Sequence, residues 1–437
     1  MKISIIGTGF VGLVTGSCFA EQGVDVTCVD TDRQRVNRLI YGALSIYEPG
    51  LENTMTSNVN SGRLHFSLDF NKGFEDMDYV FCTIETQPDT DGSSNVQPVL
   101  DIAKMFGQLV TRHSVFIIKS AVPVGTAEKA RDIIDEQLKH RGVDFSFDIV
   151  SNPDFVTEGN AIKNFMKPDR IVIGTENKNA EEAMARLYRP ILMHNTRRVI
   201  FTDMRTAEMI KYAATSMLAT RVSLMNEIAN LCEIVGADIN IVQHGVGTDS
   251  RIGSKYINPG CGYGGNLFPQ DIKDMIKIAE KGGYSMDVLK AVDSVNNRQK
   301  RILFDKLVKH YGGDIKGKTV VLWGLSFKPE TDDMSDAPSI ANIELLLQAG
   351  CNVRVYDPVA MNATKLRWNE VYCGIDMYDA VKGADVLMVA TEWRQFLLPS
   401  WQHVKELMND YVIIDGRNIY DANELAEYGF AYYCVGR

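Results

Sequence analysis

The feature that most constrains the fold of this chain is a glycine-rich turn that follows its first apolar run. Residues Lys2–Ile6 are predicted to form a short strand, and Gly7-Thr-Gly-Phe-Val-Gly12 comes directly after it. A helical run continues to about Gln22, and a second predicted strand, Val24–Val29, ends at Asp30. Strand, GxGxxG, helix, strand and acid in this order are typical of a dinucleotide-binding βαβ unit. The chain is therefore predicted to begin with a doubly wound domain.

The same unit predicts the cofactor. Its glycines allow a tight turn and let a pyrophosphate approach the N-terminus of the following helix. Asp30 is expected to hold the adenosine ribose hydroxyls, which favours NAD over NADP. The predicted NAD contacts are Gly7, Gly9, Gly12, Asp30, Arg35 and Thr86.

Apolar runs separated by helical patterns extend this organisation along the chain. Residues 1–200 are predicted to be the NAD-binding domain, with a parallel sheet, and residues 201–300 a central helical domain, which a helix from Thr206 to about Cys232 dominates. Residues 315–437 repeat the αβ pattern without a GxGxxG turn, so a different ligand is expected there. The predicted fold class is α/β, with two Rossmann-like doubly wound domains joined by a long central helix and a ligand crevice between the domains. The predicted strands are Tyr79–Thr83, Ser114–Lys119, Phe147–Val150, Ile171–Gly174, Thr319–Trp323, Val353–Tyr356, Val386–Ala390 and Val412–Asp415, and the shorter predicted helices are Val99–Val110 and Ser339–Gln348.

The composition of the chain indicates which kinds of partner it can bind and in which compartment it is expected. The chain has 437 residues and a net charge of −10, from 46 Lys and Arg against 56 Asp and Glu. This balance argues against a nucleic-acid partner. No apolar run is long enough for a membrane span, no signal peptide is apparent, and the eight scattered cysteines form no CxxC pair. We therefore expect a cytoplasmic protein with reduced cysteines, no membrane association and no metal site.

A second glycine-rich stretch, Pro259-Gly-Cys-Gly-Tyr-Gly-Gly-Asn-Leu-Phe-Pro-Gln-Asp271, precedes a predicted helix over Ile272–Lys281. Four glycines would let the backbone approach a ligand closely, and Asp271 stands where it could begin or cap the helix. The stretch alone is equally compatible with a plain connector between two helical regions.

Nine motifs in one order identify a resemblance to a known family. They are Gly7–Gly12, Tyr47-Glu-Pro-Gly-Leu51, Val122-Pro-Val-Gly-Thr126, Ser151-Asn-Pro-Asp-Phe-Val-Thr-Glu-Gly159, Lys211-Tyr-Ala-Ala214, Arg251-Ile-Gly253, the glycine loop 259–271, Gly324-Leu-Ser-Phe-Lys-Pro329 and Asp415-Gly-Arg-Asn418. Over essentially its whole length the chain resembles the UDP-glucose 6-dehydrogenases of the UDP-glucose/GDP-mannose dehydrogenase family. The resemblance implies oxidation of the sugar C6 alcohol to a carboxylate with two NAD, through cysteine-bound intermediates, in polysaccharide biosynthesis.

The chain departs from the family pattern at positions that carry this chemistry. Leu267 stands where the family has its nucleophilic cysteine, and Gln270 stands where it has a lysine. Ala121 replaces a threonine that positions water, and Thr215 replaces an asparagine. Asp154 replaces a glutamate that is one methylene longer. The resemblance therefore implies a catalytic set reduced to Lys211, Glu158, Asp271 and Asp154.

The cofactor side departs at two further positions. Glu85 stands at a glycine of the family's Val-Gly-Thr-Pro, close to the cofactor's phosphates and ribose. A negative charge at this place opposes the binding of a pyrophosphate. Ser335 stands where the family has an arginine that contacts the cofactor.

The nucleotide-sugar side matches the family pattern. Lys328 and Arg417 match cations that hold the UDP moiety, and Tyr256 matches an aromatic residue of the substrate pocket. Arg251 matches an arginine that reaches the substrate of a neighbouring subunit, which implies a homodimer. The predicted substrate contacts are Arg251, Tyr256, Gly264, Lys328 and Arg417, and the predicted ligand is UDP-glucose or a related UDP-hexose.

Three hypotheses for the function remain open. The chain could be an oxidoreductase limited to two-electron chemistry, including transient use of NAD in an epimerisation. It could be a non-catalytic protein that binds UDP-sugar and NAD. It could also complete the ordinary reaction through another thiol, for which Cys261 of the glycine loop is the candidate.

Overall fold

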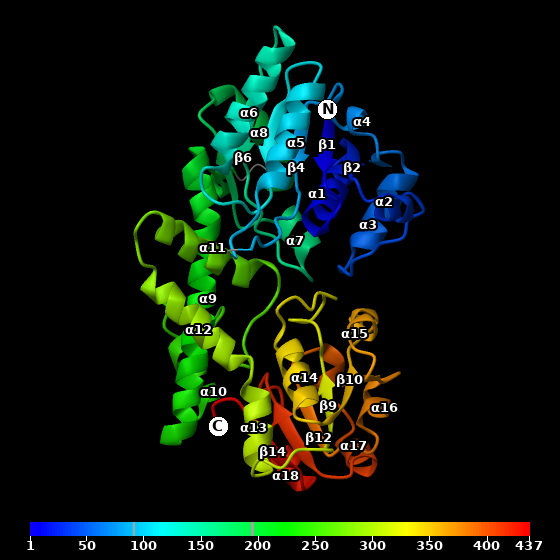
Figure 1. Ribbon diagram of the computed structural model, residues 1–437, viewed down its shortest axis with the longest axis vertical. Coiled ribbons are helices and arrows are strands. Elements are labelled where there is room, and N and C mark those ends of the chain that lie inside the picture. Colours follow the sequence, from blue (N-terminus) through cyan, green and yellow to red (C-terminus); the bar gives the residue numbers. More distant parts are fainter. Residues whose placement is uncertain (91, 194–195) are drawn as a thin grey trace. The chain divides into compact units, whose positions relative to one another are not determined.

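The computed structural model describes residues 1–90, 92–193 and 196–437 (Figure 1). The chain divides into two compact units, Met1–Ala214 and Thr215–Arg437. Each unit contains one sheet with helices on both faces, as the predicted fold class requires.

The first unit is built on an eight-stranded sheet in the order β3-β2-β1-β4-β5-β6-β7-β8. Four of its central strands are buried throughout, which explains their continuous apolar runs. The strand order reverses between β1 and β4, the point at which doubly wound folds bind their ligands. The strands are β1 (Lys2–Ile6), β2 (Asp25–Val29), β3 (Leu64–Ser67), β4 (Tyr79–Cys82), β5 (Val115–Ile118), β6 (Asp148–Ser151), β7 (Ile171–Gly174) and β8 (Val199–Thr202).

Side chains that alternate along these strands belong to two separate hydrophobic clusters. Ile5 and Phe81 join the cluster under α1, α3, α7 and α8, whereas Ile6 and Cys82 join the cluster under α4, α5 and α6. Alternation of this kind is how a doubly wound sheet supports a helical layer on each face. The helices are α1 (Phe10–Glu21), α2 (Arg33–Ile40), α3 (Leu51–Asn60), α4 (Phe70–Phe74), α5 (Gln97–Leu109), α6 (Thr126–Arg141), α7 (Ala161–Met166) and α8 (Lys178–Leu192), with a 3₁₀ turn at Thr196–Arg198.

This sheet is parallel except at one junction. β6 and β7 are antiparallel and pair through Ser151 and Gly174. β7 and β8 are again parallel to each other. The predicted parallel domain is thus extended by a strand pair that runs in the opposite direction.

A single long helix, α9 (Met204–Val235, 32 residues), runs from the first unit into the second (Figure 1). At 1.5 Å per residue it is about 48 Å long. It is longer than the predicted helix by two residues at its start and three at its end. Lys211 lies in its first part and Thr215 begins its second part.

The second unit contains a six-stranded parallel sheet in the order β11-β10-β9-β12-β13-β14. Its strands alternate as in the first sheet, since Leu322 and Trp323 belong to different hydrophobic clusters. The sequence predicted its four inner strands but neither edge strand. The strands are β9 (Thr319–Trp323), β10 (Asn352–Tyr356), β11 (Tyr372–Cys373), β12 (Val386–Val389), β13 (Val412–Asp415) and β14 (Ala431–Cys434).

The helix after the glycine loop begins earlier than predicted. α11 spans Leu267–Lys281, so Asp271 lies inside the helix and not at its cap. Pro269 lies in the first turn, where a missing N–H breaks no helical hydrogen bond. The other helices of the unit are α10 (Ile239–Gly247), α12 (Asp287–Gln299), α13 (Ile302–His310), α14 (Pro338–Gln348), α15 (Met361–Arg367), α16 (Met377–Val381), α17 (Trp401–Leu407) and α18 (Ala422–Glu427), with a 3₁₀ turn at Arg394–Phe396.

Within the described parts of the chain, no helix combines the length and the apolar character that crossing a membrane requires.

Candidate functional site

The glycine turn after β1 has the geometry that a dinucleotide requires. Gly7 has φ of 104°, a conformation that side chains disfavour. A Cβ on Gly12 would collide with the carbonyl oxygen of Gly7 and would come within 2.7 Å of the Thr83 hydroxyl. The N-cap residue of α1 is Gly9, which has no side chain to cap the first N–H groups. The first N–H groups of α1 are therefore available to an anion, as pyrophosphate binding demands.

Asp30 lies at the carboxyl end of β2, beside this turn. Its Oδ2 accepts hydrogen bonds of 2.7 Å from both the backbone N–H and the hydroxyl of Thr8, and its Oδ1 accepts one from the Asp32 N–H. Arg35 lies 3.5 Å from Asp30 in an ion pair. Partial burial pushes the pKa of Asp30 upward, but the hydrogen bonds from Asp32 and Thr8 outweigh it and lower that pKa below its ordinary value. Asp30 is thus held as a carboxylate, the form that accepts hydrogen bonds from ribose hydroxyls.

The segment after β4 lies against the same turn. The Thr83 hydroxyl donates to the carbonyl oxygens of Ile6 and Gly7, at 3.0 and 2.9 Å. The Thr86 hydroxyl donates to the carbonyl oxygen of Ala121, at 3.2 Å. Glu85 places a carboxylate oxygen 2.5 Å from the point where a Cβ of Gly9 would stand. The glycines and Asp30 fit NAD, and the charge of Glu85 is the feature that does not.

In the first unit, one predicted catalytic residue lies beside an aromatic ring and another forms a buried ion pair. Lys211 places its Nζ 5.7 Å from the ring centroid of Phe155, the residue that follows Asp154. Asp154 forms an ion pair with Lys119 at 3.3 Å, and both side chains are 6% exposed. Glu158 lies half-buried in the segment between β6 and α7. The sequence did not predict the Lys119–Asp154 pair, although a lysine at the end of a buried strand is an unusual residue that could have marked it.

In the second unit, the glycine loop is fixed by hydrogen bonds from several elements. Asn226 of α9 accepts from the Gly260 N–H at 2.9 Å, and Gln299 of α12 donates to the Gly260 carbonyl at 2.7 Å. Asn296 of α12 both accepts from and donates to the backbone of Tyr263, at 3.0 Å each. The loop is therefore a buried part of the fold, and the reading of it as a plain connector does not account for these contacts.

The loop also receives backbone contacts from the segment after β9. Gly265 donates its N–H to the carbonyl oxygen of Ser335, at 2.7 Å. A Cβ on Gly264 would stand 2.6 Å from the carbonyl oxygen of Asp336. Only a glycine fits at position 264, and Ser335 acts here through its backbone.

Leu267 is the first residue of α11 and is half-buried. Asp271 follows one turn later on the same side of the helix and is 2% exposed. Gln270 donates a hydrogen bond to Asp274, at 3.0 Å. The position at which the resemblance implies a nucleophilic cysteine thus carries only a hydrocarbon side chain.

Cys261 is completely buried in the hydrophobic cluster of the second sheet. Its thiol faces the carbonyl oxygen of Ala390 at 3.6 Å. Burial raises the pKa of Cys261 above its ordinary value. A buried thiol with a raised pKa is a poor nucleophile, so the geometry does not favour its use as a substitute.

Two of the predicted UDP-binding cations lie beside Phe327. Arg417 donates to the carbonyl oxygens of Ala390, Gly262 and Phe327, at 2.8, 3.2 and 3.4 Å, and pairs with Glu392 at 3.2 Å. Lys328 is half-buried, with its Nζ 6.0 Å from the ring centroid of Phe327. Arg417 therefore joins the glycine loop to the ends of β9 and β12.

The other two predicted substrate side chains, Tyr256 and Arg251, make different contacts. Tyr256 stacks on Phe268 of α11, with ring centroids 6.2 Å apart, and has φ of 60°. Arg251 is 87% exposed and pairs with Asp249 at 2.6 Å. Within the second unit, the Arg251 side chain forms no hydrogen bond or ion pair with the other predicted substrate residues.

The second sheet has an acid, Asp357, at the end of β10, where Asp30 stands in the first sheet. Asp357 accepts six hydrogen bonds and is 1% exposed. A carboxylate has about four lone-pair sites, so this acid has no capacity left for a ribose. The second sheet is thus closed to the dinucleotide mode of the first. The donors are the N–H groups of Leu325, Ser326, Val359 and Ala360, the Ser326 hydroxyl and the Trp393 indole.

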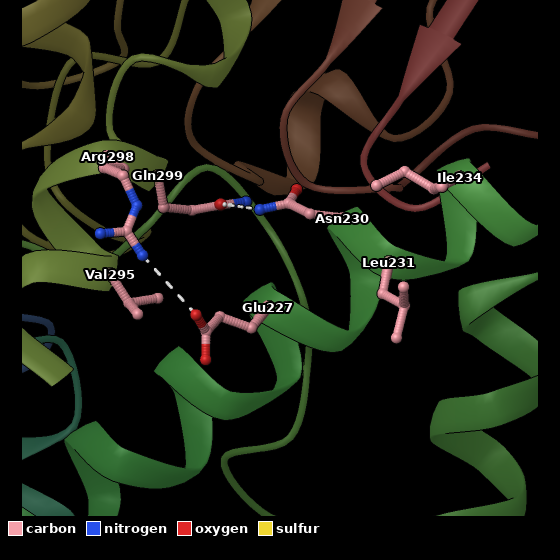
Figure 2. Close-up of a pocket in the computed structure, with 7 residues that line it drawn as sticks. All are labelled: Glu227, Asn230, Leu231, Ile234, Val295, Arg298 and Gln299. Carbon is pink, nitrogen blue, oxygen red and sulfur yellow. Dashed lines mark hydrogen bonds and ion pairs between the residues drawn. The ribbon is translucent and has the colours of Figure 1, made fainter. Parts of the chain in front are cut away.

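A pocket of about 240 Å³ lies between α9 and α12 (Figure 2). Glu227 and Arg298 form an ion pair at 3.6 Å across it, and Asn230 donates to Gln299 at 2.8 Å. No predicted site residue lines this pocket. Within the described residues, no cluster of three or more His, Cys, Asp or Glu side chains could hold a metal ion.

Comparisons with known proteins match the chain from end to end. Three family models match it: the NAD binding domain of the UDP-glucose/GDP-mannose dehydrogenase family over residues 1–192, the central domain over 205–298 and the UDP binding domain over 321–422. The UDP-glucose 6-dehydrogenase of Pseudomonas aeruginosa is 43% identical, covering 100% of this chain and 98% of the relative. The UDP-glucose 6-dehydrogenase YwqF of Bacillus subtilis is 42% identical over the same shares.

Solved structures agree with these matches. The UDP-glucose dehydrogenase of Pyrobaculum islandicum has a TM-score of 0.89 at 32% identity, covering 100% of this chain and 97% of that one. The UDP-D-ManNAc dehydrogenase of Pyrococcus horikoshii has a TM-score of 0.87 at 23% identity, covering 100% and 99%, and supports the fold alone.

Proposed function

The chain belongs to the UDP-glucose/GDP-mannose dehydrogenase family, and from this premise we propose that it is a nucleotide-sugar oxidoreductase that stops short of the uronic acid. The observation that carries the proposal is Leu267 at the start of α11. A leucine side chain cannot form a thiohemiacetal, so an aldehyde would not be trapped for a second oxidation.

The first oxidation requires less from the protein. It needs a cation or donor to polarise the alcohol oxygen, a group to accept its proton, and NAD to accept the hydride. Lys211 supplies the cation. Asp154, Glu158 or Asp271 accepts the proton, directly or through water; Asp154 would do so beside Lys119, its ion-pair partner.

The substrate is proposed to be a UDP-hexose such as UDP-glucose. Lys328 and Arg417 provide positive charge beside the glycine loop, and charged donors of this kind suit a diphosphate. Gly264, the remaining proposed contact of the glycine loop, packs against the backbone of Asp336. Tyr256 supplies an aromatic surface.

The alternative is a protein that binds UDP-sugar and NAD without turnover. It is favoured by the further replacements at Gln270, Ala121 and Thr215, because these accompany the loss of the thiol. A redox-neutral use of bound NAD, as in an epimerisation, is a variant of the first proposal.

The decisive experiment measures NADH formed per molecule of UDP-glucose consumed, with purified protein and excess NAD. One NADH with an aldehyde or ketone product is the expected result, and Lys211→Ala should abolish it. Two NADH per sugar would refute the proposal and would require another nucleophile. No NADH, with UDP-glucose still bound in calorimetry, would favour the binding protein or the epimerase, which a product assay separates.

We also propose that the protein is a homodimer. On α9, Met217, Leu224 and Leu231 recur every seven residues and are 65%, 54% and 55% exposed, and Ile234 continues the stripe at 81%. An exposed apolar stripe with this spacing is typical of a helix that packs against another copy. Light scattering should give the mass of a dimer, and Leu224→Glu should convert it to a monomer. Leu366→Glu, on the exposed surface of α15, is the matched control.

The proposed compartment is the cytoplasm, and the proposed pathway is the biosynthesis of a polysaccharide. All eight cysteines are free thiols, which suits a reducing compartment. Supply of sugar nucleotides for polysaccharides follows from the proposed substrate class and rests on it.

A further inference from the structure

We infer that Glu85 is an internal anion that competes with the phosphates of the dinucleotide, so that NAD binds only when this carboxylate leaves the glycine turn. The inference rests on the proposed binding of NAD at that turn. It adds a residue that sets cofactor affinity from outside the GxGxxG fingerprint.

The position of Glu85 is determined by its neighbours. Thr83 is bonded to the carbonyl oxygens of Ile6 and Gly7, and the Ile84 side chain lies 3.1 Å from the point where a Cβ of Gly7 would stand. Thr86 is held by the Ala121 carbonyl. With the backbone anchored on both sides, the Glu85 side chain extends along the turn and reaches Gly9.

At Gly9 the carboxylate occupies the space that the fingerprint reserves for a ligand. Its Oε1, Cδ and Cγ lie 2.5, 3.2 and 3.6 Å from the point where a Cβ would stand. Gly9 is the N-cap residue of α1 and offers no side-chain cap to the first N–H groups of that helix. A carboxylate is favoured by the positive end of a helix, which is the same property that attracts a phosphate.

Within the described parts of the chain, no cationic side chain pairs with this carboxylate. Among the residues that the structure describes, none forms an ion pair or a hydrogen bond with the Glu85 side chain, which is exposed. The nearest acid of the fingerprint, Asp30, is itself held as a carboxylate by Thr8 and Asp32. The carboxylate is therefore mobile enough to move aside but remains close enough to repel a pyrophosphate.

The expected size of the effect follows from Coulomb's law. In a medium close to water, one unit charge about 5 Å from the carboxylate weakens binding roughly fourfold, and the two charges of a pyrophosphate together weaken it on the order of tenfold. Because the charges are exposed, added salt should reduce the effect. A purely steric obstruction would not depend on salt.

The test measures NAD, ADP and adenosine binding to the full-length protein by titration calorimetry, comparing the wild type with Glu85→Gln. The variant keeps the size of the side chain and removes its charge. Glu85→Gln should bind NAD and ADP on the order of tenfold more tightly, should bind adenosine unchanged, and should lose its advantage as salt is raised. Glu75→Gln is the matched control: this exposed glutamate precedes β4 at the opposite edge of the sheet, and its replacement should change none of the three affinities.

Two results would overturn the inference and leave the proposed function intact. One is equal or weaker NAD binding by Glu85→Gln when the wild type binds NAD. The other is an equal gain in adenosine affinity in Glu85→Gln, because adenosine has no phosphate and the effect would then be steric and not electrostatic. Absence of NAD binding by both proteins would overturn the inference together with the proposed cofactor, whereas binding by the variant alone would support both.

Discussion

Asn296 offers the sharpest test of how the glycine loop is held in place. Its side chain is 2% exposed, and it satisfies both the N–H and the carbonyl of Tyr263 at 3.0 Å. Asn296→Ala removes both partners and leaves two backbone groups in a buried region. Each such group costs about 1–3 kcal/mol. Partial relaxation of the loop would admit water, so we expect a loss of about 3 kcal/mol in the free energy of unfolding.

For a unit of this size, a loss of that magnitude corresponds to a fall in Tm of roughly 6–12 °C. The assay is thermal unfolding, together with calorimetric titration of UDP. UDP affinity should fall, because Gly262 and Gly264 flank the released residue, while NAD affinity should not change. Asn296→Asp should lie between the wild type and alanine, since a carboxylate can accept from Tyr263 but cannot donate to it.

The adjacent Asn297 provides a control on the same helix. It is exposed and bonds only to Asp293, one turn earlier. Asn297→Ala should therefore leave the Tm and the UDP affinity near the wild-type values. If Asn296→Ala and Asn297→Ala had the same Tm, the loop would not depend on the two hydrogen bonds, and the reasoning would be refuted.

Three further predictions concern the proposed chemistry, the cofactor turn and the pH dependence of stability. Leu267→Cys alone should not restore two NADH per UDP-glucose, because Gln270 and the other replacements remain; a full yield in the stoichiometric assay would contradict this. Gly12→Ala should abolish NAD binding in calorimetry, since its Cβ would collide with the Gly7 carbonyl, and retained affinity would show that the turn can shift. Burial raises the pKa of Glu208 to about 7 from 4.5, against hydrogen bonds from Ala127 and Gly125 that lower it. The folded state therefore binds the Glu208 proton more tightly than the unfolded state does. The contribution of this proton to the free energy of unfolding, at most about 3 kcal/mol, is complete below pH 4.5 and is lost as pH rises through 7. Urea unfolding at several pH values should show this fall in the wild type but not in Glu208→Gln, and parallel pH profiles of the two proteins would contradict the prediction.

The sequence predicted the fold well where local patterns determine it. The buried inner strands of both sheets are continuous apolar runs, and β1, β7, β9 and β13 have the predicted bounds. β3 and β8 were missed because they are short and partly exposed, so their pattern is weak. The start of α11 was misplaced because an asparagine before Leu267 adopts a helical conformation that no local signal indicates.

The site was predictable as a set of positions but not as a set of contacts. The turn at Gly7–Gly12 and Asp30 follow from one local pattern. The pairing of Lys119 with Asp154, and the carbonyl contacts of Arg417, join segments far apart in sequence. Such contacts depend on the order and register of neighbouring strands in the sheet, which the sequence alone does not specify. Whether the residue roles implied by the family resemblance hold for this chain stays a prediction.

The two acids that end β2 and β10 should behave differently under mutation, although they occupy the same place in their sheets. Among the described residues, the two oxygens of Asp30 accept four hydrogen bonds, only one of them at Oδ1, whereas the two oxygens of Asp357 accept six. In a mutational scan that measures the abundance of folded protein and the binding of ligand separately, substitutions of Asp357 should lower the abundance of the protein. Changes at Asp30 should leave folded protein that captures less NAD. For engineering, this asymmetry means that substitutions at Asp30 can alter cofactor preference. Substitutions at Asp357 would instead destabilise the second unit, because this residue binds the surrounding backbone.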